Sequence, residues 1–243
     1  MGLSHSPRIV TDGLVFCVDA ANPRSYPGAG TVWTDLIVRH TGTLTNMDDS
    51  NFSSDNAGTL NFDGTDEYVN YNDQNEFRIV NDITVTAWVK KDTTPSAHQE
   101  IINLYRRGTS PFYTCLIFSI RGTSDPSHTD QLQFFHRNSS SQTDQLFSVD
   151  TIPNGIWTHT SVTSDTSTVR FYINGEQTAT GTQSFQREID ESYTSALRIA
   201  ALGPPDGSPE YLDGQISNVQ MYNRALSEEE IKQNYNATKW RFQ

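Results

Sequence analysis

Basic residues are scarce in this chain of 243 residues. Lys and Arg together number 17 against 29 Asp and Glu, which gives a formal net charge of −12. No run of basic residues interrupts this acidic balance, so the phosphate backbone of a nucleic acid would be repelled rather than held. We therefore expect no nucleic-acid partner, and a surface whose negative charge resists non-specific association.

Long hydrophobic segments are also missing. The first ten residues, MGLSHSPRIV, lack the apolar core of a signal peptide. No stretch of the chain approaches the roughly 18 consecutive apolar residues that a membrane helix needs. We expect no membrane partner, and synthesis in a cytoplasm without secretion through a signal peptide.

Cysteine is nearly absent. Cys17 and Cys115 each lie in an apolar run, where a thiol commonly packs as a small buried hydrophobe. Synthesis in a reducing cytoplasm favours that interpretation. A disulfide between them stays open, because pairing depends on a geometry that spacing along the chain does not fix.

Strand-like runs recur throughout the chain. Apolar and other residues alternate with a period of two over 83–90 and 168–174, as a half-buried strand requires, whereas the strand-like run 14–19 is apolar on both faces, which indicates deeper burial. Asn174-Gly175 is the strongest turn signal, because a type I′ hairpin needs positive φ at both positions. Many short strands, polar turns and no alternation of strand with helix predict two packed antiparallel sheets in one domain.

The end of the chain predicts a strand followed by a helix. Alternation over 216–222 places Ile216, Asn218, Gln220 and Tyr222 on one face and Ser217, Val219 and Met221 on the other. Ser227 and Glu230 have the spacing of a capping box, which marks a helix start.

Several segments, in this order, resemble the laminin-G-like domains of the concanavalin A-like superfamily, of the type found in bacteriophage virion structural proteins. The resemblance covers most of the chain, and its segments are GLVFCVDAANPRSYPGAGTVWTDL, LNFDGTDEYVNY, ITVTAWVKKD, IWTHTSVTSDTSTVRFYINGEQ and YNRALSEEEI. It implies an all-β fold, an antiparallel jelly-roll β-sandwich with one short C-terminal helix. The domain would span 13–243 behind an N-terminal arm, 1–12, and its first and last strands would pair.

The chain departs from the usual phage pattern at one loop. The family commonly carries a DLSGNGN turn where this chain has DLIVRH, from Asp35 to His40. We expect that loop to differ in shape from its counterparts.

No catalytic motif emerges. Some glycoside hydrolases of this fold carry E-x-D-x-E on a strand, but here Glu188 and Asp190 alternate correctly while Glu191 falls on the opposite face. The paired carboxylates of a hydrolase are therefore missing. Trp157 and His159 match a W-x-H pattern of the family, which we interpret as packing. We expect no enzymatic activity and assign no catalytic residue.

A structural calcium is the one cofactor that the resemblance suggests. Calcium prefers six to eight oxygen ligands. The candidates near the paired termini are Asp12, Asp19, Asp213 and Asn218. Relatives often have an acidic residue where this chain has Ser217-Asn218, so no ligand set is assigned.

Sugar binding is common among relatives and would use an aromatic platform with Asn or Asp hydrogen bonds. The candidate aromatic residues, for a glycan or for a subunit interface, are Trp33, Tyr105, Tyr113, Tyr211 and Trp240. Each could equally belong to the core.

The resemblance favours a non-enzymatic structural protein of a tailed-phage virion, acting through contacts with other capsid or tail proteins. A domain start near Gly13 leads us to expect a capsid decoration or a short fibre or appendage subunit, made in the host cytoplasm and located in the virion. Phage appendages suggest a homo-oligomer such as a trimer. The alternative is a carbohydrate-binding adhesin that recognises host surface glycans.

Overall fold

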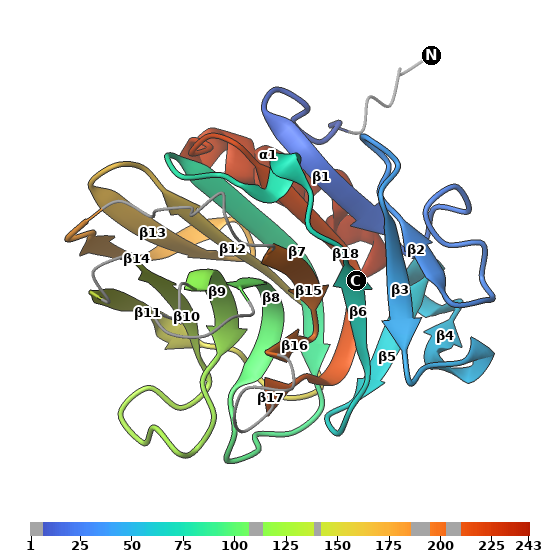
Figure 1. The fold of residues 1–243 in the computed structure, drawn as a ribbon. Helices are drawn as coiled ribbons and strands as arrows, with labels where there is room; N and C mark the ends of the chain where they lie inside the picture. The colour runs from blue at the N-terminus through green and yellow to red at the C-terminus, as the bar shows by residue number, and fades with distance from the viewer. Residues whose placement is uncertain (1–6, 107–113, 139–141, 186–194, 203–209) are drawn as a thin grey trace.

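The computed structural model describes residues 7–106, 114–138, 142–185, 195–202 and 210–243. Two large antiparallel sheets pack face to face, and one α-helix lies outside them (Figure 1). The architecture confirms the predicted jelly-roll β-sandwich with a short C-terminal helix. No helix in the described part of the chain is long and apolar enough to cross a bilayer.

Sheet A brings the two ends of the domain together. Its order is β14-β13-β12-β7-β18-β5-β4, and β1 pairs with β18 beside this path. Its strands are β1 (Leu14–Asp19), β4 (Phe52–Ser53), β5 (Thr59–Asp63), β7 (Ile83–Lys91), β12 (Thr158–Ser164), β13 (Thr168–Ile173), β14 (Glu176–Thr182) and β18 (Asp213–Tyr222).

Sheet B forms the other layer, in the order β11-β10-β9-β8-β15-β6-β3-β2. Its strands are β2 (Val32–Thr34), β3 (Thr41–Thr45), β6 (Tyr68–Tyr71), β8 (Gln99–Arg106), β9 (Thr114–Ile120), β10 (Gln131–Arg137), β11 (Thr143–Thr151) and β15 (Ser195–Ile199). Two short strands, β16 (Ala201–Leu202) and β17 (Glu210–Tyr211), pair with each other next to β8 (Figure 1).

The pairing of the first strand with the last is confirmed, with Val18 opposite Val219. The predicted faces of β18 are wrong at one end, because a bulge shifts the register between Ile216 and Asn218. A bulge inserts one residue and reverses the alternation on either side of it. Ile216 therefore lies in the core together with Val219 and Met221.

The predicted hairpin turn is also confirmed. Asn174 and Gly175 connect β13 to β14 with φ of 51° and 80°. Positive φ at both positions is the type I′ geometry that matches the twist of the flanking strands.

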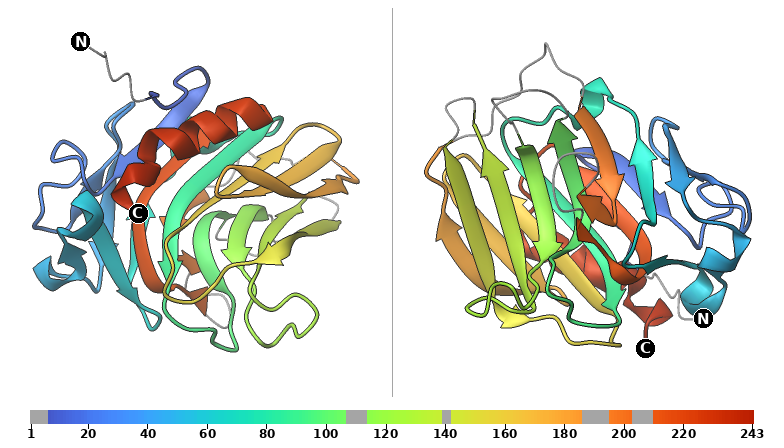
Figure 2. Two further views of the ribbon diagram at one scale, coloured as in Figure 1. Left: turned by 180° about the vertical axis from the view of Figure 1, so that it is seen from behind. Right: turned by 60° about the horizontal axis from the view of Figure 1, so that its bottom comes forward.

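Helix α1 (Glu228–Thr238) covers the outer face of sheet A, as Figure 2 shows from behind. Ser227 and Glu230 form the predicted capping box. The Tyr235 ring stacks on Trp88 of β7 with centroids 5.8 Å apart. The described residues also form four short 3₁₀ helices: η1 (Asp49–Asn51), η2 (Asp55–Ala57), η3 (Asn75–Phe77) and η4 (Lys239–Arg241).

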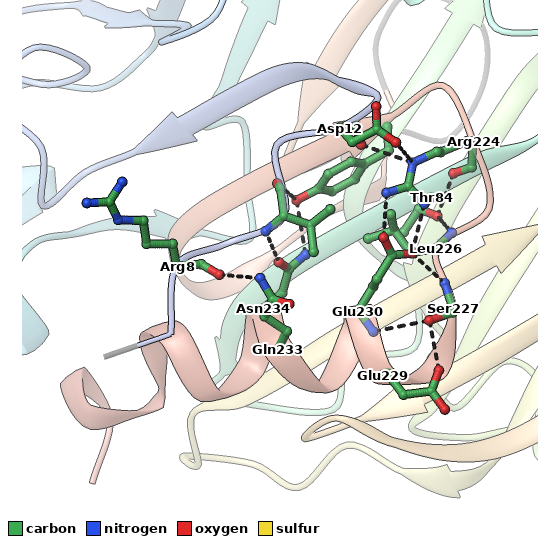
Figure 3. Close-up of polar contacts among 12 residues, drawn as sticks. Arg8, Asp12, Thr84, Arg224, Leu226, Ser227, Glu229, Glu230, Gln233 and Asn234 are labelled. Carbon is green, nitrogen blue, oxygen red and sulfur yellow. Dashed lines mark hydrogen bonds and ion pairs between the residues drawn. The ribbon is translucent and has the colours of Figure 1, made fainter. Parts of the chain in front are cut away.

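The described part of the N-terminal arm is tied to this helix (Figure 3). The backbone N–H of Val10 donates to Asn234 Oδ1 at 2.8 Å, and Gln233 Nε2 donates to the Arg8 carbonyl at 2.7 Å. Arg224 joins the arm to the helix start, since it contacts Asp12 and Glu230. The arm and α1 thus cover the same side of the sandwich and leave the outer face of sheet B on the opposite side.

Candidate functional site

A row of polar side chains crosses the outer face of sheet B. Cross-strand pairing places Thr43 beside Asn70, Asn70 beside Arg198 and Arg198 beside Asn103. Each residue is flanked along its strand by core residues, so alternation directs it outward. We call Thr43, Asn70, Arg198 and Asn103 the polar row.

Arg198 lies at the centre of the polar row. Its Nε donates to Asn70 Oδ1 at 3.3 Å, and its guanidinium carbon lies 5.6 Å from the centroid of the Tyr68 ring. The residue is 9% exposed, yet its Nη1 has no hydrogen-bond partner. Asn103, fully buried, uses its Nδ2 to bind the carbonyl of Ala201, while its Oδ1 is unpaired.

Two tyrosines stand beside Arg198. The rings of Tyr68 and Tyr211 lie with centroids 6.4 Å apart. Tyr211 belongs to β17, so the short β16–β17 pair brings an aromatic ring close to Tyr68 and Arg198. Burial and, to a lesser degree, the negative charges nearby raise the pKa of Tyr211, so its hydroxyl keeps its proton at neutral pH.

A pair of carboxyl groups lies close to the same short strands. Glu100 of β8 is 1% exposed and its carboxyl group is within hydrogen-bonding reach of Glu210. Burial, followed by the charge of Glu210, raises the pKa of Glu100 well above its ordinary value. Burial also raises the pKa of Glu210. Burial and the neighbouring carboxylate therefore both disfavour the charged form of Glu100.

The five aromatic residues proposed from the sequence do not form one platform. Tyr211 lies beside Arg198 but is only 8% exposed, and Trp33 is fully buried. Trp240 is 63% exposed in η4, at the end of the helix that covers sheet A. The side chain of Tyr105 and the whole of Tyr113 lie outside the described residues.

The burial of Trp33 depends on residues of neighbouring strands, Gly42 and Tyr71. Its neighbour across the strands is Gly42, and a Cβ at Gly42 would come within 2.3 Å of the Tyr71 ring. Only glycine lets that ring lie flat on β3, where its hydroxyl donates to the Trp33 carbonyl at 2.7 Å. Trp33 is therefore part of the core, and offers no face to a glycan or a partner subunit.

Three of the four residues considered for calcium are engaged by other side chains. The Asp12 carboxylate lies 3.1 Å from Arg224, and the Asp19 carboxylate lies 3.0 Å from Arg241. Asp213 accepts a hydrogen bond from Thr93, and Asn218 is opposite Asp19 in the β1–β18 register. No group of three or more His, Cys, Asp or Glu side chains in the described ranges could hold a metal ion.

Of the residues considered for catalysis in the sequence, the structure describes only some. Glu188, Asp190 and Glu191 lie outside the described residues. His159 is buried between Trp88 and Tyr235, with ring centroids at 5.3 and 5.8 Å, which supports a packing role. Cys17 is buried and is not in a disulfide.

A concavity lies apart from the polar row, beside the connection from β6 to β7. It measures about 410 Å³, and its lining includes Val15, Glu76, Arg78, Asp82 and Asn223. Arg78 already pairs with Asp73 at 2.5 Å. No aromatic side chain is part of this lining, so the cleft lacks the ring that most sugar sites use. The polar row is the better candidate.

Comparison with protein families decides the ancestry of this fold. A family profile named Laminin_G_3, described as the concanavalin A-like lectin/glucanases superfamily, matches residues 63–232. The chain belongs to this superfamily. A comparison with curated protein sequences gave no match.

Solved structures resemble this laminin-G-like domain over nearly its whole length. Trypanosoma rangeli sialidase in complex with sialic acid is 18% identical, with a TM-score of 0.65 over 96% of this chain and 34% of the sialidase chain. The botulinum neurotoxin serotype G binding domain is 12% identical, with a TM-score of 0.60 over 91% of this chain and 50% of the other. The domain therefore spans about a third of the sialidase. At these identities the likeness shows the fold alone.

Proposed function

We propose that this laminin-G-like domain is a non-enzymatic carbohydrate-binding adhesin that holds a surface glycan against the outer face of sheet B. The observation that carries the proposal is the polar row, where Asn70 and Arg198 lie side by side next to Tyr68. Planar amide and guanidinium groups can hydrogen-bond two adjacent sugar hydroxyls, and an aromatic ring supplies apolar contact for the sugar ring.

The position of the polar row supports this use. The helix and the N-terminal arm cover sheet A, whereas the β16–β17 pair lies next to β8 of sheet B (Figures 1 and 2). Thr43 is exposed and Asn70 is half-buried, so the row reaches solvent at its β3 end. A glycan would enter from that end and reach Arg198 after Asn70.

The spacing of the two carboxyl groups near the polar row favours glycan binding without hydrolysis. A glycosidase holds its two carboxyl groups about 5 Å or more apart, on either side of the scissile bond. Glu100 and Glu210 instead lie within hydrogen-bonding reach of each other in a largely buried contact, where burial raises the pKa of both carboxyl groups. We propose that they stabilise β17 against β8 and take no part in chemistry.

The virion role expected from the sequence rests on the sequence resemblance alone, and neither similar structure described above supports it. A glycan-binding domain can serve as an adhesin in that setting or in another. The homo-oligomer and the capsid or tail partners likewise stay predictions.

A glycan array probed with the intact chain tests the proposal, followed by calorimetric titration of the best glycans. We expect saturable binding that Asn70→Ala weakens about tenfold, which corresponds to one or two lost hydrogen bonds. Trp240→Ala, on the opposite layer, is the control and should bind like the wild type. Absence of binding to any glycan, or equal loss in both variants, would refute the proposal.

A further inference from the structure

Arg198 has an unusual charge environment for a buried arginine. The other buried lysine and arginine side chains among the described residues have a carboxylate partner: Lys91 Nζ lies 2.7 Å from Asp130, and Arg241 Nη1 lies 3.0 Å from Asp19. Arg198 has no carboxylate within ion-pair distance in the parts of the chain that the structure describes. Its neighbours are the neutral Asn70 and Asn103 and the rings of Tyr68 and Tyr211.

A buried charge without a counter-charge is costly, since its desolvation is not offset by an ion pair. An arginine at a surface could turn its head into water, but Arg198 is only 9% exposed and its Nη1 has no partner. The polar row thus retains a cationic donor that no carboxylate of the described residues neutralises. Such a donor complements an anion that arrives with a ligand.

The chemistry of the site narrows the kind of anion. A guanidinium presents two parallel N–H donors that match the two oxygens of a carboxylate. A phosphate group carries more charge and is usually held by several cations or by backbone amides, whereas here a single arginine lies in a chain of net charge −12. One guanidinium balances one carboxylate. The unpaired Oδ1 of Asn103 adds an acceptor for a hydroxyl group beside it.

We propose that Arg198 binds the carboxylate of an acidic sugar, a hexuronic acid or another sugar acid, within the glycan site. This inference rests on the proposed function and names its ligand class. Arg198 then decides specificity: the neighbouring amides and tyrosines hold the sugar ring, and the guanidinium selects rings that carry a carboxylate.

The test uses matched ligands. Acidic oligosaccharides, their carboxyl-reduced neutral counterparts and sulfated counterparts are titrated into the wild type and into Arg198→Gln. The wild type should bind the acidic member at least about tenfold more tightly than its neutral counterpart. Arg198→Gln should abolish this preference, so that the acidic member and its neutral counterpart bind the variant with similar affinity. Arg198→Lys should restore only part of it, because an ammonium lacks the fork.

The outcomes separate the two proposals. If the wild type binds glycans but carboxyl reduction leaves affinity unchanged, or sulfated and carboxylated ligands bind equally, the acidic-sugar inference is wrong and the carbohydrate-binding function stands. If no member binds, both fail. Arg170→Gln removes the same charge from sheet A, where Arg170 pairs with Asp165, and should keep the preference for the acidic member.

Unfolding of the ligand-free variants provides a second readout. Because no carboxylate in the described ranges pairs with Arg198, Arg198→Met should leave the melting temperature unchanged or raise it. A merely structural arginine predicts a clear drop in melting temperature. That drop, together with an unchanged ligand preference, would overturn the inference.

Discussion

The guanidinium of Arg241 lies 3.0 Å from both carboxylate oxygens of Asp19, which joins the first strand to the last turn across 222 residues. The same guanidinium donates to Ser217 Oγ at 2.5 Å and to the Asn56 carbonyl at 3.0 Å. The C-terminal turn is thereby fastened to the β1–β18 pair.

Arg241→Gln should destabilise the domain by about 2–4 kcal/mol, because it leaves Asp19 charged and largely buried without its partner. Denaturant unfolding monitored by tryptophan fluorescence measures the change in the free energy of unfolding. Lys239→Gln, in the same turn, removes a cation that lies 5.3 Å from the Tyr235 ring and should change stability by less than about 1 kcal/mol. Equal effects of the two substitutions would contradict the fastening role.

Calcium should not stabilise the wild-type domain. Asp19 and Asp12, two of the expected ligands, already direct their carboxylates to Arg241 and Arg224. Calcium would have to displace these guanidinium groups to gain its oxygen ligands. We expect the same melting temperature in calcium chloride and in chelator. A rise of several degrees with calcium would show a site that these ion pairs do not exclude.

His159 should make the domain sensitive to acid. Burial lowers the pKa of His159 to about 3, so the imidazole is neutral in the folded state. In the unfolded chain the group takes up a proton below about pH 6.5, and stability is lost as the pH falls from there toward 3. This proton uptake by the unfolded chain lowers the free energy of unfolding by about 1.4 kcal/mol at pH 5.5.

The measurement compares wild type with His159→Gln at pH 7.5 and 5.5. The difference at pH 7.5 isolates the packing loss. At pH 5.5 the free energy of unfolding of the wild type, relative to that of His159→Gln, should be about 1.4 kcal/mol lower than at pH 7.5. A difference that does not depend on pH would show that His159 is protonated in both states or neutral in both.

Glu100→Gln should stabilise the domain at neutral pH. Because the folded state raises the pKa of Glu100, the unfolded chain releases this proton first, and stability falls as the pH rises from about 4.5 toward the folded-state pKa. Glutamine keeps a donor toward Glu210 and has no charge to bury. The gain should therefore grow between pH 4.5 and 7, measured as the free energy of unfolding.

Glu229→Gln provides the opposite case. Hydrogen bonds from its own backbone amide and from Ser227 lower the pKa of Glu229 at the start of α1. Its substitution should reduce stability slightly as the pH rises through the same range. If Glu100→Gln also reduces stability as the pH rises, the folded state does not raise the pKa of Glu100, which contradicts the prediction.

Local patterns in the sequence were sufficient to predict the sandwich and the helix. Alternation gave the strands, and Ser227 with Glu230 gave the helix start. The face of Ile216 was predicted wrongly, because a bulge depends on the neighbouring strand and leaves no local mark.

The candidate site could not be read from the sequence for a similar reason. Asn70, Arg198 and Asn103 each look like an ordinary outward residue between two apolar ones. They become a row through the register of β6, β15 and β8, which are far apart in the sequence. Trp33, by contrast, looks like a binding aromatic, and its burial depends on Gly42 and Tyr71.

The most direct measurement of the carbohydrate-binding proposal is an NMR titration of the ¹⁵N-labelled domain with the tightest glycan from the array. The account predicts saturable shifts of the backbone amides of β3, β6, β15 and β8, centred on Thr43, Asn70 and Arg198. Shifts confined to α1 and the strands beneath it, or no saturable shifts at all, would contradict it.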